Sequence, residues 1–176
     1  MSIIKSLTVE EVTNIRTLIN GITGLWAPHE IRGQSISLAG IPELAGKTIW
    51  LHYKDYGDWI QYKSEQITAI QHILDDLKNK ISNTARFGRT YIHTLGPGKI
   101  VGRHRDGSAN YRDPAYFDVV KRYQIYLDIP EQCEIESASL IAENSLVLFD
   151  HKSWHSYTNN SDRDLVFIVF DLLENK

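Results

Sequence analysis

Residues 89–106, RTYIHTLGPGKIVGRHRD, decide the fold of this chain. Residues 89–95 include Thr, Tyr and Ile, which favour strands. Gly96-Pro97-Gly98 is a strong turn signal, and residues 99–103 predict a second strand. The segment therefore predicts two strands joined by a tight turn.

The pattern of short predicted strands and turns continues from this segment to the end of the chain. Short strands separated by turns are predicted at residues 121–129, 133–136, 139–142, 145–149, 154–158 and 165–172. Seven or eight short strands with regular turn signals indicate a sandwich or barrel, and a two-sheet jelly roll suits that number. The predicted fold class is therefore mainly β, a cupin-like jelly roll with helices only in the N-terminal half.

The N-terminal half predicts two amphipathic helices. Thr8 and Glu11 form a capping-box pattern before a helix that ends near Gly21. A second helix starts near Ser64, and its apolar stripe is made of Ile67, Ile70, Ile73, Leu74, Leu77 and Ile81. Residues 35–38 and 48–53 are candidate short strands. We expect a single domain over residues 1–176, in which residues 1–85 pack on a β core formed by residues 86–176.

Composition and charge exclude several classes of protein. The 176 residues carry a formal net charge of −3 without a basic run, so we expect no nucleic-acid partner. A single cysteine, Cys133, excludes a disulfide within the chain and a zinc site built from two thiolates. No stretch approaches the roughly 20 apolar residues that span a bilayer, and the N-terminus has no cleavage-site pattern. We therefore expect a cytoplasmic protein without a membrane anchor.

His104 and Asp106 are candidate metal ligands, because residues i and i+2 of a strand point to the same face. His155, on a strand 155 − 104 = 51 residues downstream, supplies a third ligand. Two histidines and one carboxylate form the facial triad that binds Fe(II) and leaves coordination positions open. His151 competes with His155, four residues away. The His-Glu-x-x-His pattern of helical zinc sites is absent, so we expect His151 in a turn and prefer His155.

Arg163 follows His155 by 163 − 155 = 8 residues. A dicarboxylate that chelates iron through one end leaves its other carboxylate inside the protein, where a guanidinium can bind it with two hydrogen bonds. This role is one hypothesis for Arg163. The alternative is a surface residue in the turn formed by residues 161–164.

Three stretches resemble the aspartyl/asparaginyl β-hydroxylase family: LGPGKIVGRHRDG at 95–107, KRYQIYLDIP at 121–130 and SLVLFDHKSWHSYTNNSDRDLVFIVFDLL at 145–173. The resemblance covers roughly residues 91–172. It implies a double-stranded β-helix, a kind of jelly roll, and an enzyme that uses Fe(II), 2-oxoglutarate and O₂ to hydroxylate an unactivated C–H bond, releasing succinate and CO₂. It further implies that His104, Asp106 and His155 bind the iron and that Arg163 binds the distal carboxylate of 2-oxoglutarate. Because Asp106 completes the triad, the sequence is similar to the bacterial branch of the family.

The resemblance also suggests roles for three other residues. Gln124 falls where many relatives have a histidine near the other carboxylate of 2-oxoglutarate, and its amide can still donate a hydrogen bond. His93 falls near a position that contacts the co-substrate. Arg122 falls where a relative's arginine contacts the carboxylate of the substrate, and its alternative role is that of a surface strand residue. The loop at residues 107–118 is either a lid over the substrate or an ordinary surface loop.

The predicted function is that of a dioxygenase dependent on Fe(II) and 2-oxoglutarate. The expected substrate is an amino acid, or a peptide or protein side chain, that bears a carboxylate. Two alternatives remain open: a non-catalytic jelly-roll binding protein, and a cupin-like metalloenzyme that does not use 2-oxoglutarate. Loss of 2-oxoglutarate dependence in Arg163→Ala would favour the dioxygenase.

Overall fold

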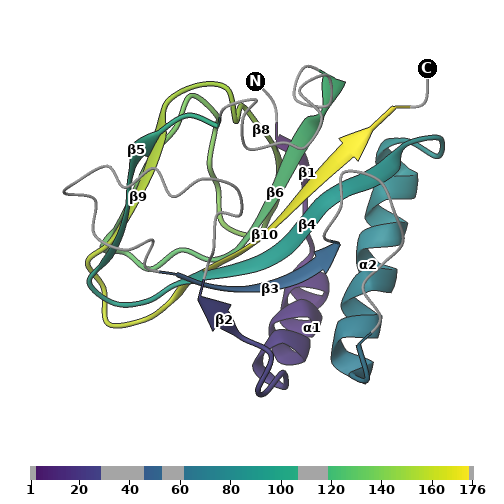
Figure 1. Ribbon diagram of the computed structural model, residues 1–176, viewed down its shortest axis with the longest axis horizontal. Coiled ribbons are helices and arrows are strands. Elements are labelled where there is room, and N and C mark those ends of the chain that lie inside the picture. The colour runs from purple at the N-terminus through teal and green to yellow at the C-terminus, as the bar shows by residue number, and fades with distance from the viewer. Residues whose placement is uncertain (1–2, 29–45, 53–61, 107–118, 175–176) are drawn as a thin grey trace.

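The computed structural model describes residues 3–28, 46–52, 62–106 and 119–174 (Figure 1). Their helices are α1 (Val9–Asn20) and α2 (Glu65–Ile81). Their strands are β1 (Ile3–Ser6), β2 (Ala27–Pro28), β3 (Gly46–His52), β4 (Arg86–Leu95), β5 (Lys99–His104), β6 (Lys121–Asp128), β7 (Cys133–Glu136), β8 (Ser145–Phe149), β9 (His155–Asn159) and β10 (Leu165–Leu173).

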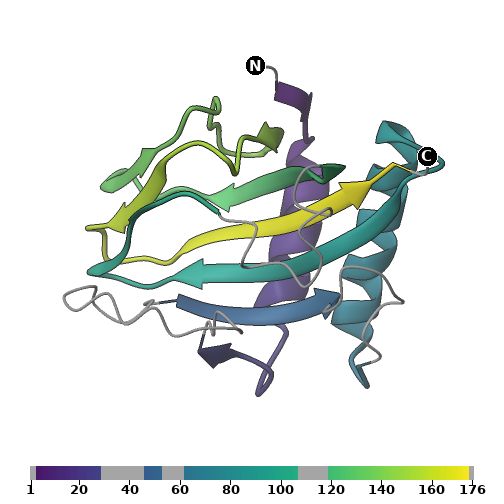
Figure 2. The same ribbon diagram turned by 45° about the horizontal axis from the view of Figure 1, so that its top comes forward.

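The strands form two antiparallel sheets. The larger sheet has the order β1-β8-β6-β10-β4-β3-β2, and the smaller one has the order β5-β9-β7. Figure 1 shows the smaller sheet on one side of the larger sheet and the two helices on the other side. In Figure 2 the long strands β6, β10 and β4 lie next to one another in front of the helices. This arrangement confirms the predicted mainly β jelly roll.

The helices begin where the sequence predicts. The Thr8 hydroxyl accepts a hydrogen bond from the Glu11 amide (3.1 Å), and the Glu11 carboxylate accepts one from the Thr8 amide (2.8 Å), so the capping box is confirmed. The Ser64 hydroxyl accepts from the Ile67 amide at the start of α2. Each helix buries one apolar face against the larger sheet. This core includes Val12, Ile15, Ile67, Ile70, Leu74, Ile92, Ile125, Ile168 and Phe170.

A second core lies between the two sheets. It contains Leu95, Val101, Tyr126, Phe149, Tyr157, Leu165, Phe167 and Val169. Because alternate residues of a strand point to opposite faces, Tyr123 and Ile125 of β6 pack toward the helices, whereas Arg122, Gln124 and Tyr126 contact groups between the sheets. The alternation of β6 therefore brings polar side chains into the space where the site is formed.

Some local expectations differ from the structure. The predicted strand at residues 139–142 is wrong, since this segment is an irregular connection in which the Ser139 hydroxyl accepts from the Asp150 amide (2.7 Å). The strand β1 was not expected, and it pairs with β8. The candidate strand at 35–38 lies outside the described residues.

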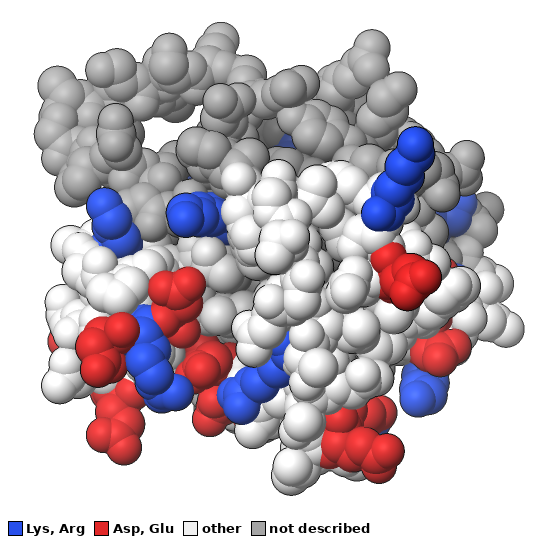
Figure 3. All heavy atoms as spheres, turned by 90° about the horizontal axis from the view of Figure 1, so that it is seen from below, with Lys and Arg blue, Asp and Glu red and all other residues white. Residues whose placement is uncertain are grey.

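The larger sheet contains strands from both sides of residue 85, where the sequence analysis separated the N-terminal part from the β core. Strands β1, β2 and β3 from the N-terminal part are hydrogen-bonded within the larger sheet, and β3 pairs directly with β4. In the described part of the chain, no helix has both the length and the apolar character needed to cross a membrane. Figure 3 shows one face of the molecule, on which described acidic and basic side chains are interspersed.

Candidate active site

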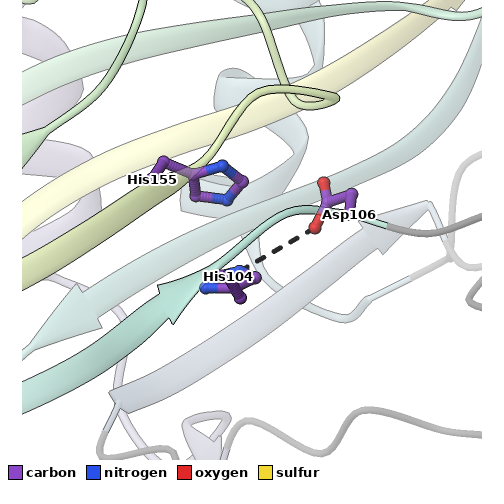
Figure 4. A group of neighbouring side chains, drawn as sticks. All are labelled: His104, Asp106 and His155. Atoms are coloured by element: carbon purple, nitrogen blue, oxygen red, sulfur yellow. Dashed lines mark ion pairs between the residues drawn. The ribbon is translucent and has the colours of Figure 1, made fainter.

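Three side chains converge at the paired ends of β5 and β9. His104 ends β5 and His155 begins β9, and the two residues are partners in the strand register. Asp106 follows His104 by two residues, and one ligand atom from each of the three residues lies within 4.8 Å of the others. The His104 Nε2 and Asp106 Oδ1 atoms are 3.9 Å apart. Figure 4 shows the three side chains facing one common point.

Both histidine rings are oriented by backbone carbonyl groups. The Nδ1 atom of His104 lies 2.8 Å from the Gly102 oxygen, and the Nδ1 atom of His155 lies 2.9 Å from the Ser153 oxygen. Because a carbonyl oxygen only accepts, each ring donates from Nδ1 and keeps the lone pair of Nε2 for a metal. Burial also lowers the pKa of His155, which favours the neutral imidazole that a metal requires.

The turn between β8 and β9 fixes the two ligand segments relative to each other. The Asp150 carboxylate accepts from the Ser153 hydroxyl (2.6 Å) and from the Lys152 amide (3.2 Å). The carbonyl of His151 accepts from the Asp106 amide (3.0 Å). His151 is buried in this turn, and its position in a turn agrees with the expectation. The three converging side chains include His155 and not His151.

Asp106 is held by a buried guanidinium. Arg122 donates from Nη1 to the Asp106 Oδ2 atom, and from Nε and Nη2 to the two Asp171 oxygens at 2.7 and 2.9 Å. Burial by itself would raise the pKa of Asp106, but the charge of Arg122 and the neighbouring histidines outweigh it, so the pKa is lowered. Asp106 is therefore an anionic ligand at neutral pH.

The polar residues Gln124 and His93 lie in the interior behind His155. The Tyr126 hydroxyl donates to the Gln124 carbonyl oxygen, and the Gln124 amide nitrogen lies 3.4 Å from the Tyr157 hydroxyl. The Tyr157 ring centroid is 6.2 Å from that of His155. His93 is buried, 5.0 Å from the ring of Phe167, which stacks on Tyr157. Both sequence-predicted residues are thus connected to His155 through aromatic side chains, Gln124 through Tyr157 and His93 through Phe167 and Tyr157.

Arg163 lies elsewhere. It belongs to the turn between β9 and β10, at the end of β9 opposite His155. Its side chain is 61% exposed, and its Nη1 atom is 3.5 Å from Asp128. This setting is the surface turn given as the alternative, and the role of Arg163 as the co-substrate anchor stays a prediction.

The sequence reasoning missed three residues of this interior. Tyr126 and Tyr157 are buried, and burial raises the pKa of both hydroxyls, that of Tyr157 to about 12. Asp171 has no exposed surface. One signal could have revealed it, because Asp171 is the only charged residue of the apolar strand β10.

The donor set fits Fe(II). Two imidazoles and one carboxylate on one side of a metal, with the remaining positions open, are the facial triad of non-haem iron oxygenases. For a dicarboxylate, the adjoining interior offers the Gln124 amide and the Tyr126 and Tyr157 hydroxyls as neutral hydrogen-bonding groups. A jelly roll with this triad defines the class of Fe(II)-dependent oxygenases.

The particular family follows from comparison of the sequence. The family model of the Aspartyl/Asparaginyl beta-hydroxylase matches residues 26–175, and the chain belongs to this family. Fe(II) and 2-oxoglutarate are the cofactor and co-substrate that membership implies. A comparison with curated proteins gave no match.

Solved structures support the same fold. An oxidoreductase of the 2OG-Fe(II) oxygenase family from Burkholderia pseudomallei is 11% identical, with 97% of this chain and 81% of that chain covered and a TM-score of 0.60. A prolyl-4-hydroxylase from Pseudomonas putida is 13% identical, with 97% and 89% covered and a TM-score of 0.55. A collagen prolyl hydroxylase from Paramecium Bursaria Chlorella virus-1, in complex with 2OG, is 14% identical, with 94% and 91% covered and a TM-score of 0.52.

Proposed function

We propose that this enzyme hydroxylates an unactivated C–H bond of an amino acid or of a peptide or protein side chain. The observation that carries the proposal is the convergence of His104, Asp106 and His155 beside a buried, partly polar interior. When bound, Fe(II) and 2-oxoglutarate supply the oxidising chemistry with O₂, and succinate and CO₂ are released.

The residues of this chain prepare the site in three ways. The triad supplies three ligands on one side and leaves the other coordination positions to the co-substrate and O₂. Carbonyl groups fix both histidine rings before a metal arrives. The apolar side chains of Val101, Phe149 and Phe167 are buried between the sheets and exclude water from the interior.

In this proposal the co-substrate lies beside Gln124 and His93, the two buried residues to which the family resemblance assigns contact with it. Arg163 remains a candidate for its distal carboxylate, although reaching the interior from an exposed turn would require its side chain to move. The substrate class rests on the family description and on two structural relatives named as prolyl hydroxylases. We place the reaction in the cytoplasm, consistent with the single cysteine.

The first experiment is an anaerobic titration of the metal-free protein with Fe(II) and then 2-oxoglutarate, followed by visible absorption. A charge-transfer band that needs both additions and is lost in His104→Ala supports chelation at the triad. His72→Ala is the matched control, because this histidine lies on the exposed face of α2 and its loss should leave the band unchanged.

Two other results would each support an alternative. Binding of Fe(II) without any effect of 2-oxoglutarate indicates a metalloenzyme that does not use this co-substrate. Failure to bind Fe(II) indicates a non-catalytic jelly roll. If the band forms, succinate release is measured with free amino acids and peptides, and a substrate that raises it above the uncoupled rate identifies the class. Arg163→Ala then tests the anchor, since a raised KM for 2-oxoglutarate is expected if Arg163 binds it.

A further inference from the structure

A chain of three charged groups connects the two sheets behind the triad. Asp171 of β10 and Arg122 of β6 are partners in the register of the larger sheet. Arg122 binds Asp171 with two nitrogens and Asp106 with a third. Asp106 follows β5 of the smaller sheet, so the guanidinium bridges the sheets and ends on a metal ligand.

Stability alone does not explain this pair. The side chain of Arg122 is 7% exposed and that of Asp171 has no exposure. Removing two such charges from water costs several kcal/mol per ion, and an apolar pair of similar volume is often at least as stable. Moreover, Asp171 lies in a strand whose other residues are all apolar. We therefore expect the ion pair to have a function besides stabilising the core. The contact of Arg122 with Asp106 indicates what that function is.

We propose that Arg122 and Asp171 are positioning residues that make Asp106 a ligand through one oxygen. The inference rests on the proposed function, because it concerns the same iron site. Arg122 occupies the Oδ2 atom of Asp106, and the Oδ1 atom is left facing His104. A carboxylate held in this way would offer a metal only Oδ1, because Oδ2 is occupied by the guanidinium.

Asp171 fixes the orientation of the Arg122 guanidinium. Its two oxygens accept from Nε and Nη2 in the bidentate geometry typical of arginine and carboxylate. Two carboxylates and one guanidinium carry a net charge of −1, which attracts a dication. Without Asp171 the guanidinium could rotate and compete with the metal for both oxygens of Asp106.

This arrangement gives Arg122 a different role from the substrate contact suggested by the sequence. In the structure, Nε, Nη1 and Nη2 are each directed at a carboxylate of the protein. The two roles predict different effects of substitution. A positioning residue changes the affinity for the metal, whereas a substrate-binding residue changes the KM for the substrate.

The test is the binding of Co(II) to the metal-free protein, measured by calorimetry and by the visible ligand-field spectrum. The variants are Arg122→Lys, Arg122→Gln and Asp171→Asn. Loss of such supporting groups typically weakens metal binding by about 10- to 100-fold, and we expect this range for Arg122→Gln and Asp171→Asn. Arg122→Lys keeps one charged donor and should fall between the wild type and Arg122→Gln. A changed spectrum is expected where Asp106 becomes a two-oxygen ligand.

Two further variants keep the result interpretable. Glu143→Gln removes a carboxylate from an ion pair with Arg16 that is exposed on the surface (2.8 Å), and its affinity for Co(II) should equal that of the wild type. The double variant with Arg122→Gln and Asp171→Asn leaves no charge at the fully buried position 171, and the carboxylate that remains, Asp106, is 15% exposed. It is therefore the variant to use if Arg122→Gln alone does not fold. Circular dichroism at the titration temperature checks folding.

The outcomes separate this inference from the proposed function. No Co(II) binding by the wild type, or equal binding by His155→Ala, overturns the metal site and the inference with it. Wild-type binding that is lost in His155→Ala but unchanged in the folded double variant overturns the inference alone. Unchanged metal affinity with a raised substrate KM in Arg122→Lys would instead support the substrate-contact role.

Discussion

Replacing Phe167 with alanine tests whether the space beside the triad is a packed core. Phe167 is 4% exposed and stacks on Tyr157 with a centroid distance of 5.3 Å and an interplanar angle of 14°. It also lies 5.5 Å from the ring of Tyr126 and 5.0 Å from that of His93. The substitution therefore removes one ring from contact with three others.

The expected loss is large because these neighbours cannot collapse into the space. Truncation of a buried phenylalanine to alanine typically costs about 3–5 kcal/mol, including the cavity that remains. In a protein of 176 residues, each kcal/mol lowers Tm by about 2–4 °C, so the expected decrease is about 6–20 °C. Urea unfolding of the metal-free protein measures the free energy directly. The midpoint should fall while the slope with urea stays the same.

Leu148→Ala is the control for this measurement. Leu148 is 38% exposed on β8, so its truncation should cost clearly less than that of Phe167. A loss below about 1 kcal/mol for Phe167→Ala would refute the packed-core argument. It would mean that the aromatic rings line an open pocket that water already fills.

Three other measurements check separate links of the argument. Metal at about 100 times its Kd should stabilise the wild type by about 2.7 kcal/mol, or about 5–11 °C in Tm, and His155→Ala should lose this increase. Because the pKa of Asp106 is lowered on folding, its ionisation stabilises the metal-free protein above the unfolded pKa near 4, and this contribution is lost as the pH falls through the folded pKa. Urea unfolding of the wild type and Asp106→Asn between pH 7 and 3 should therefore converge at the acidic end. Thr8→Ala should cost about 1 kcal/mol by removing the N-cap, whereas Thr13→Ala in the exposed middle of α1 should cost less.

Each of these has a contradicting result. An equal rise of Tm in His155→Ala would place the metal elsewhere. A stability difference between the wild type and Asp106→Asn that stays constant down to pH 3 would mean that the charge of Asp106 contributes nothing. Equal losses for Thr8→Ala and Thr13→Ala would show that the capping box does not stabilise α1.

The triad could be predicted because its signal is local. The two-residue period of a β-strand predicted that His104 and Asp106 point the same way; in the structure Asp106 lies just after the end of β5 and still converges with His104. His155 begins a strand whose alternation was readable. In the jelly roll, the strands that carry these residues are hydrogen-bonded neighbours, and His104 pairs with His155. The helices were equally readable, since the caps at Thr8 and Ser64 depend on neighbours three residues away.

Arg163 shows where local reasoning ends. Its position eight residues after His155 left two roles open, and the structure places its side chain in an exposed turn at the far end of β9; its role as co-substrate anchor stays a prediction. A short separation along the chain does not by itself determine the distance between two side chains in space. The bridge from Asp171 through Arg122 to Asp106 was hidden for the same reason, because its first and last members are 171 − 106 = 65 residues apart.

The sequence by itself determined the strand-rich class, the helix starts, the family and the three candidate ligands of the metal. These properties arise from periods of two and 3.6 residues and from short motifs, which act between near neighbours. Only the tertiary structure decided which polar side chains share the space between the sheets: Arg122 with Asp106 and Asp171, and Gln124 with Tyr126 and Tyr157. Those contacts depend on sheet order and register, which are set by packing of the whole core.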